Sequence, residues 1–339
     1  MNLDAFDYFL PEEKISQKPK IDRSSSKLLL INRNNHELRD EKFSNIHKYF
    51  SSKDLLIIND TKVIPARIFG YRKYTKGKVE IFIERIISQK HFFCQVRSTR
   101  KIKEKQRIVI SDEIELEILH NDGTLCKVEI LNSNAEYLLR NFGEVPLPPY
   151  INRKATNEDK LYYQTIFAQN EGSVACPTAA LHFDNKILNI IKNKGINIAY
   201  ITLHIGMGTF TTIKDRDINN HKMHSENYFI PSRTDYLVKK HKKNGGKIIA
   251  VGTTSARALE SFYTTSNVVD KFYQTDIFIK PGYKFKIVDH LITNFHLPKS
   301  SLLIMISAFY NREKILQSYN YAINNNYNFF SYGDSTLIL

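Results

Sequence analysis

The sequence lacks a hydrophobic stretch long enough to cross a membrane. Its longest apolar run, Leu302 to Phe309, has the length of a buried helix or strand, whereas a membrane-spanning helix needs about 20 apolar residues. A secretory signal is also missing, because the N-terminal segment MNLDAFDYFLPEEK has acidic residues where such a signal would be basic. We therefore expect a globular protein that stays in the cytoplasm.

Cysteine is scarce, with only Cys94, Cys126 and Cys176 in 339 residues. The odd number argues against a disulfide framework, and the spacing matches no metal site. Cys176 is a conceivable nucleophile, but no basic residue stands beside it in sequence to lower the pKa of its thiol. We therefore do not place it among the catalytic candidates.

Acidic residues are few relative to basic ones, which gives a formal net charge of +14. Such a charge predicts an anionic partner, with nucleic acid the first candidate. The chain is also rich in Lys, Asn and Ile, so part of this charge is solvated surface. Five lysines between 239 and 247 fit an exposed helix face. A denser cluster between 97 and 107 is the predicted phosphate-binding surface, and its RNA-contacting candidates are Arg97, Arg100, Lys101 and Lys103.

The hydrophobic pattern changes twice along the chain. Short alternating runs such as KVEIFIERI (78–86) and HFFCQVRS (91–98) follow one another without helices between them, which is typical of a small antiparallel barrel. On either side, runs that are apolar throughout alternate with helical segments, which indicates a sheet covered on both faces. These runs include DLLIIND (54–60), NIAYITLHIG (197–206) and KIIAVG (247–252), and a helix or turn is predicted between the strand SKLLLINR (26–33) and the first of them. We predict an α/β main domain with a mixed, largely buried sheet flanked by helices (1–65 and 151–339), into which a small antiparallel β-barrel domain (66–150) is inserted.

Three histidines each end an apolar run among small and hydroxyl residues. They are His182 in PTAALHF, His204 in ITLHIGMGTF and His296 in ITNFHLP. Any one of them alone fits a core histidine bonded to backbone. Because all three stand where a strand gives way to a turn, together they predict one pocket built from several strand ends. Imidazole titrates near neutrality, so this pocket is the expected place for proton transfer.

Two further segments carry polar groups at predicted strand ends. In GTTSARALES, the hydroxyls of residues 253–255 precede a helix start, where free N–H groups hold anionic or polar groups. N-capping explains one of these hydroxyls but not all three. Arg257 follows in the first turn, an unfavourable place for a cation unless it faces a ligand or a carboxylate. GMGTF supplies Gly206 and Gly208 for close backbone approach to a planar ligand, although it is not a dinucleotide fingerprint.

The segment HKMHSENY offers His221, His224 and Glu226. These three are conceivable metal ligands, but neither an HExxH motif nor a cysteine pair supports a metal site, and we expect none. Glu226 is better placed as a hydrogen-bonding carboxylate or a proton acceptor.

Nine segments are spread along essentially the whole chain, from Phe6 to Gly333. They are FDYFLPEEKISQKP, INDTKVIPARIFG, PLPPYI, SVACPTAALHFD, ITLHIGMGTF, HKMHSE, AVGTTSARALES, IKPGYKFKIVDHLITNFHLPKSSLL and FFSYGD. Together, and in this order, they resemble a known family, the S-adenosylmethionine:tRNA ribosyltransferase-isomerases of queuosine biosynthesis. Where the family usually has glycine in APTAGLHF, this chain has Ala180, and Met207 and Ser301 stand where small residues and threonine are common. None of these changes removes a polar group.

The resemblance implies that the ribosyl unit of S-adenosylmethionine passes to 7-aminomethyl-7-deazaguanine at the wobble position of tRNA. Epoxyqueuosine forms, and adenine and methionine leave. It implies S-adenosylmethionine as co-substrate, no prosthetic group, and action as a monomer. Proton transfer is expected of His182, His204, His296 and Glu226, and Asp60 is expected to neutralise the sulfonium or bind the ribose. The remaining substrate-binding candidates are Thr61, Arg67, Thr178, Gly206, Gly208, Thr209, His224, Thr253, Thr254, Ser255, Arg257, Asn294, Lys299 and Ser300.

Two other functions stay open at the level of sequence. An RNA methyltransferase with the same donor would release S-adenosylhomocysteine and no adenine. A non-catalytic RNA-binding module would use the basic barrel and keep its histidines in the core.

Overall fold

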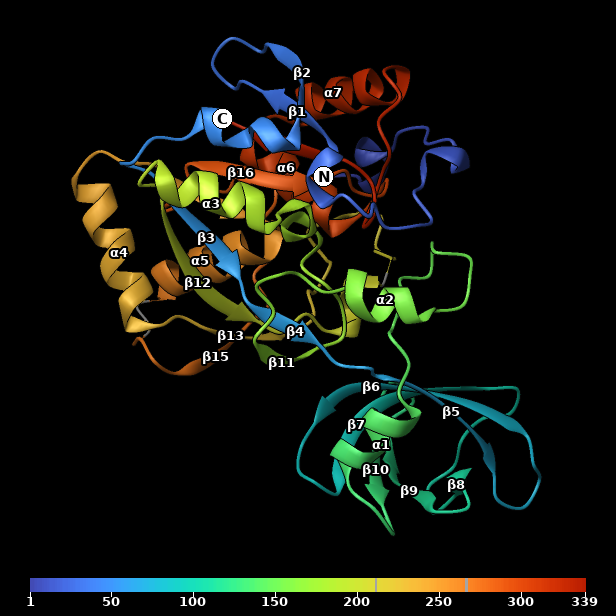
Figure 1. Ribbon diagram of the computed structural model, residues 1–339. Helices are drawn as coiled ribbons and strands as arrows, with labels where there is room; N and C mark the ends of the chain where they lie inside the picture. The colour runs from blue at the N-terminus through green and yellow to red at the C-terminus, as the bar shows by residue number, and fades with distance from the viewer. Residues whose placement is uncertain (211, 266–267) are drawn as a thin grey trace.

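The computed structural model describes residues 1–210, 212–265 and 268–339 (Figure 1). In this part of the chain a nine-stranded sheet with helices is joined to a closed six-stranded barrel. Figure 1 shows the barrel set apart from the sheet domain, reached through β4 and left through the segment that leads back to α2. The predicted fold class is confirmed. The domain boundaries at 65/66 and 150/151 stay a prediction.

The main sheet has the order β15-β13-β12-β3-β14-β16-β17-β1-β2. The four central strands β12, β3, β14 and β16 run parallel, and antiparallel pairs β13–β15 and β1–β2 lie at its two ends. The strands are β1 (Lys27–Ile31), β2 (Leu38–Lys42), β3 (Leu55–Asn59), β12 (Asn197–Leu203), β13 (Glu226–Phe229), β14 (Ile248–Val251), β15 (Phe272–Thr275), β16 (His290–Asn294) and β17 (Ser335–Ile338). A second, two-stranded sheet pairs β4 (Thr61–Val63) with β11 (Asn170–Ser173).

Helices cover both faces of the main sheet, which explains its continuous apolar strands. In β3, Leu56 and Ile58 belong to one core cluster and Leu55 and Ile57 to the other, as the alternation of side chains along a strand requires. The helices of the sheet domain are α2 (Asn157–Tyr162), α3 (Asn185–Asn193), α4 (Ser232–Lys243), α5 (Thr253–Thr265), α6 (Ser301–Phe309) and α7 (Arg312–Asn324). Short 3-10 turns are η1 (Leu3–Phe6), η2 (Glu12–Lys14), η3 (Arg23–Ser25), η4 (Phe43–Tyr49), η5 (Thr178–His182) and η6 (Met207–Phe210).

The barrel has the order β10-β7-β6-β5-β8-β9, and its neighbouring strands pair antiparallel. Along β6, Val79, Ile81 and Ile83 are buried while the residues between them are partly exposed, so the alternating sequence pattern encodes an inside and an outside. Helix α1 (Ala135–Phe142) packs on it. The strands are β5 (Arg67–Arg72), β6 (Lys78–Ile86), β7 (His91–Ser98), β8 (Arg107–Ser111), β9 (Ile114–Asn121) and β10 (Cys126–Ile130).

One element differs from the expectation. A helix or turn was predicted between residues 33 and 54, but the structure also has the edge strand β2 there. Its sequence, LRDEK, is largely polar because an edge strand needs no buried face, so hydrophobic periodicity does not reveal it. No helix in the described ranges is both long and apolar enough to span a membrane.

Candidate functional site

A large cavity lies where the central strands β12, β14 and β16 reach their carboxyl ends. The residues that follow these strands form its walls, together with the start of η5, part of η6 and the loop before α6. Carboxyl ends of parallel strands meet at one edge of a sheet, which is where α/β proteins bind ligands. Ten predicted site residues line the cavity: Thr178, Thr209, Glu226, Thr253, Thr254, Arg257, Asn294, His296, Lys299 and Ser300.

An ion pair between Arg257 and Glu226 forms one wall of the cavity. The Nη1 of Arg257 donates to Glu226 Oε2, and Glu226 Oε1 accepts from the backbone N–H of Gly206 at 3.2 Å. Both side chains are almost completely buried. The Nε and Nη2 atoms of Arg257 are buried without a hydrogen-bond partner among the described residues. Because unpartnered buried donors are costly, this edge of the guanidinium is available for an acceptor on a ligand.

Asn294, at the end of β16, lines the cavity and offers it a hydrogen-bond acceptor, the side-chain oxygen Oδ1. Its Nδ2 donates to the carbonyl of Phe330 at 3.0 Å and to His182 Nε2 at 3.3 Å. Its Oδ1 is buried and has no partner among the residues described. The amide is therefore fixed by its donor side, which leaves the carbonyl oxygen to accept from a ligand N–H or O–H.

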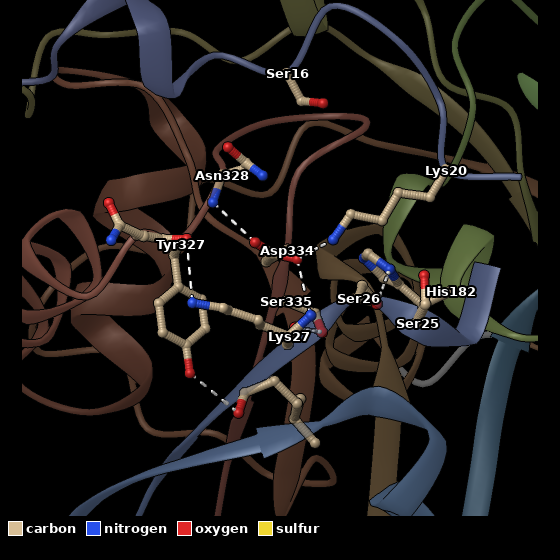
Figure 2. A network of polar contacts seen from close by, with 12 residues as sticks. Ser16, Lys20, Ser25, Ser26, Lys27, His182, Tyr327, Asn328, Asp334 and Ser335 are labelled. Atoms are coloured by element: carbon tan, nitrogen blue, oxygen red, sulfur yellow. Dashed lines mark hydrogen bonds and ion pairs between the residues drawn. The ribbon is translucent and has the colours of Figure 1, made fainter. Parts of the chain in front are cut away.

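His182 lies behind Asn294 and not in the cavity wall. Because its Nε2 accepts from Asn294, its Nδ1 carries the proton and donates to Ser26 Oγ at 2.8 Å. Burial lowers the pKa of His182 to about 4, so the ring is neutral at physiological pH. Figure 2 shows His182 beside Ser26 and near Asp334, which accepts from Lys20 Nζ at 2.5 Å and from the backbone N–H of Lys27 at 2.8 Å.

His296 is the histidine that lines the cavity. Its Nε2 and the hydroxyl of Thr293 share a hydrogen bond of 2.8 Å. Its backbone is held on both sides, since its N–H donates to Tyr319 Oη at 3.0 Å and its carbonyl accepts from Tyr8 Oη at 2.5 Å. Burial lowers the pKa of His296 to about 3. A neutral, firmly held imidazole therefore faces the ligand space.

His204 belongs to a third location. Its Nδ1 and Thr61 Oγ1 are 2.8 Å apart, and its ring stacks on Phe272 with 6.0 Å between centroids. Burial lowers the pKa of His204, and burial raises the pKa of the neighbouring Asp60, which accepts from Thr202 Oγ1 at 2.7 Å. The structure therefore does not bring the three predicted histidines into one pocket: of the three only His296 lines the cavity, and the strands β3 and β14 lie between β12, which His204 follows, and β16.

The other predicted residues have varied surroundings. Ser255 donates its hydroxyl to the carbonyl of Val251 at 2.8 Å, so it stabilises the start of α5 and does not face the cavity. Arg67, the first residue of β5, forms an ion pair of 2.7 Å with Glu80 of the neighbouring strand β6. At the rim, Lys299 pairs with Asp4 and Asp7, at 2.9 Å each.

Two more predicted positions lie close to one another near η6. A side chain at Gly208 would clash with His224, because a Cβ there would lie 2.1 Å from the ring carbon Cδ2. His224 itself is exposed.

The remaining predicted residues lie at the start of α6 and on the barrel. Ser300 accepts from Leu303 N at 3.2 Å and caps α6. The predicted RNA-contacting residues Arg97, Arg100, Lys101 and Lys103 are all exposed on the barrel.

Sequence reasoning did not select several residues that line the cavity. Tyr150 shares a 2.6 Å hydrogen bond with Ser331, and its ring lies 4.7 Å from that of Phe330. Cys176 also lines the cavity, but burial raises the pKa of its thiol, which disfavours the thiolate. Among the residues that the structure describes, no three His, Cys, Asp or Glu side chains gather as metal ligands, and Glu226 is engaged by Arg257 instead.

The buried neutral histidines make folding stability sensitive to acid. In the unfolded chain, histidines bind protons near a pKa of about 6.5, whereas the folded values are about 4 for His182 and about 3 for His296. Below pH 6.5 the unfolded state binds more protons, so each histidine removes about 1.4 kcal/mol of unfolding free energy per pH unit until its folded pKa is reached. We expect H182Q and H296Q each to flatten the decline between pH 6.5 and 4 in urea unfolding. An unchanged slope in both variants would contradict their neutral burial.

Comparison with known proteins agrees over nearly the whole chain. The family model described as "Queuosine biosynthesis protein" matches residues 3–338. A relative from Sulfurihydrogenibium sp., named S-adenosylmethionine:tRNA ribosyltransferase-isomerase, is 47% identical over 339 residues and both chains are covered completely. A relative of the same name from Francisella tularensis subsp. novicida is 43% identical, again with complete coverage of both chains.

A solved structure is similar as well. The crystal structure of an S-adenosylmethionine tRNA ribosyltransferase from Thermotoga maritima matches with a TM-score of 0.57 and 28% identity, covering 99% of this chain and 100% of that one. Family model, relatives and structure agree with one another and with the segments that the sequence shares with the family. The chain therefore belongs to the queuosine biosynthesis protein family and is an S-adenosylmethionine:tRNA ribosyltransferase-isomerase, an enzyme of tRNA modification.

Proposed function

We propose that the cavity at the carboxyl ends of β12, β14 and β16 binds S-adenosylmethionine and carries out the ribosyl transfer. The acceptor is 7-aminomethyl-7-deazaguanine at the wobble position of tRNA, the product is epoxyqueuosine, and adenine and methionine leave. The observation that carries this proposal is the pair of unpartnered groups at one cavity: the donor edge of Arg257 and the acceptor Oδ1 of Asn294.

These two groups suit an amino-acid-bearing nucleoside. The α-carboxylate of S-adenosylmethionine accepts two parallel hydrogen bonds from the free Nε and Nη2 of Arg257, the strongest arrangement available to a guanidinium. Glu226 holds the third nitrogen and so fixes the plane of the fork. Asn294 Oδ1 accepts from an N–H or O–H group of the same ligand. Neither interaction has a competing protein partner among the described residues.

The chemistry requires at least two proton transfers. The sulfonium acidifies the C5′ hydrogens, so a base removes one to give an ylide, and a proton must reach the departing adenine. The tRNA amine attacks in its neutral form, and ring reorganisation expels methionine. Of the four candidates for proton transfer, His296 and Glu226 line the cavity. We therefore propose that these two carry out the proton transfers. Because His182 bonds to Asn294, we assign it the role of orienting that amide.

His204, Thr61 and Asp60 are proposed to act from outside the cavity wall. His204 is followed directly by Ile205, which lines the cavity, so this cluster lies next to the donor site along β12. We propose that it contacts the ribose or the incoming nucleotide. We also propose that the enzyme acts as a monomer and, because its substrate is tRNA, in the cytoplasm.

The spent donor distinguishes this reaction from its main alternative. Protein, S-adenosylmethionine and tRNA carrying 7-aminomethyl-7-deazaguanine are incubated together, and the small molecules are separated by chromatography. The proposal expects free adenine and methionine in amounts equal to modified tRNA. S-adenosylhomocysteine would instead identify a methyltransferase, and an unchanged donor with bound tRNA would identify a binding module.

The basic surface of the barrel is proposed to contact tRNA phosphates. We expect the variant with alanine at 97, 100, 101 and 103 to bind tRNA more weakly, and to have a shallower dependence of log affinity on log salt, by roughly 0.7–0.9 for each lost phosphate contact. Filter binding at several salt concentrations measures this slope. As a control, alanine at Lys239, Lys240, Lys242 and Lys243 on α4 should leave it unchanged. Equal slopes for wild type and the barrel variant would reject the assignment.

A further inference from the structure

Glu84 connects the inserted barrel to the wall of the cavity. This residue belongs to β6 of the barrel, yet its carboxylate accepts from the backbone N–H of Met207 in η6, at 3.2 Å for Oε1 and 3.1 Å for Oε2. Glu84 is not among the site residues predicted from the sequence. The contact joins a barrel strand to the segment that follows β12 in the sheet domain.

An irregularity in the barrel aims this side chain. In the β6–β7 pairing, Ile83 lies opposite Cys94 and Arg85 lies opposite Phe93, so Glu84 is an extra residue without a partner. Such a bulge bends the strand and redirects a side chain, and bulges are common next to active sites. The bulge thus turns a carboxylate away from the regular barrel surface and toward η6.

Two carboxylates from two domains hold consecutive N–H groups. Glu226 of the main sheet accepts from Gly206 N, and Glu84 of the barrel accepts from Met207 N. The carboxylates are near one another: burial raises the pKa of Glu84, the Met207 N–H lowers it, and the charge of Glu226 raises it further. A Cβ at Gly206 would lie 2.6 Å from Glu84 Oε1, so a side chain at this position would displace the carboxylate.

The residues held in this way continue into the cavity wall. The Met207 side chain is buried in the barrel core, and Phe210 packs against both that core and the core of the main sheet. Thr209 and Phe210 line the cavity. One short segment is therefore anchored at its start by Glu84 and presents its end to the ligand space.

We propose that Glu84 is a positioning residue for the reaction. By holding Met207 N it fixes η6, and it thereby keeps Thr209 and Phe210 in place as the wall of the donor site. The inserted barrel thus shapes the cavity directly, in addition to any contact that it makes with tRNA. The proposal rests on the function proposed above, because the cavity must be the donor site.

Steady-state kinetics of adenine release test this role. Loss of a hydrogen bond to a charged group predicts that E84A raises the KM for S-adenosylmethionine roughly 10-fold or more, with a smaller fall in kcat. E84Q should return the KM to within about threefold of wild type, because its amide oxygen still accepts from Met207 N. A merely structural defect lowers the active fraction, and hence kcat, without changing KM.

Two further variants complete the experiment. E84D keeps the charge, but its side chain is one methylene shorter, so it should also raise the KM for S-adenosylmethionine. This variant keeps the test decisive if E84A does not fold. E129A removes another barrel carboxylate, one that faces His91 across 4.0 Å and does not touch η6, and should behave as wild type. Wild-type KM in E84A and E84D, or no rescue in E84Q, would overturn the proposal. Failure of the proposed function itself would differ, because wild type would then release no adenine.

Discussion

Replacing Arg257 by methionine is expected to lower kcat/KM for S-adenosylmethionine by roughly 100- to 1,000-fold, the usual effect of removing one partner from a buried, hydrogen-bonded charge pair. The variant loses the unpartnered Nε and Nη2 that are proposed to hold the α-carboxylate. It also leaves Glu226 buried without its cation. Adenine release under single-turnover conditions, at several donor concentrations, measures the loss.

The lysine variant separates charge from geometry at this position. R257K keeps a cation beside Glu226 but has no planar fork, so it should fold like wild type and still lose most of the donor affinity. Full activity in R257K would mean that Arg257 serves only as the counter-ion of Glu226. In that case the carboxylate of the donor binds elsewhere.

Replacing His296 by glutamine is expected to give the second large effect. A positioned general acid or base contributes about 100- to 10,000-fold to rate, and His296 is the histidine that lines the cavity. The single-turnover rate at saturating donor should fall by at least 100-fold, while donor binding changes little because the glutamine fills a similar volume.

The other two histidines supply matched comparisons. H182Q should act mainly through Asn294, so it should weaken donor binding more than it slows the chemical step. H204Q should have a smaller effect on adenine release, because His204 lies outside the cavity wall. Undiminished single-turnover rates in all three variants would reject proton transfer by histidine.

The fold could be predicted from sequence because its signals are local. Continuous apolar runs gave the buried strands β3, β12 and β14, and strict alternation gave the barrel strands such as β6. The strand that was missed, β2, is an edge strand with a polar sequence. Its pairing depends on the neighbouring β1 and not on any pattern of its own.

The site was only partly predictable, for a different reason. Arg257 stood out because a cation in the first turn of a helix needs a local explanation, and the structure supplies one in Glu226. The grouping of the histidines failed, because the sequence does not give the order of the strands in the sheet, where β3 and β14 lie between β12 and β16. Glu84 had no sequence signal at all, since only the β6–β7 register shows that it is an unpaired bulge residue facing another domain.

A structure of the protein with bound S-adenosylmethionine decides whether the cavity is the donor site. We expect density for S-adenosylmethionine in the cavity at the carboxyl ends of β12, β14 and β16, with its carboxylate on Nε and Nη2 of Arg257 and an N–H or O–H group of the ligand on Asn294 Oδ1. Density for the donor at another place, such as the cluster of Asp60, Thr61 and His204, with the Arg257 edge still unpartnered, would contradict it.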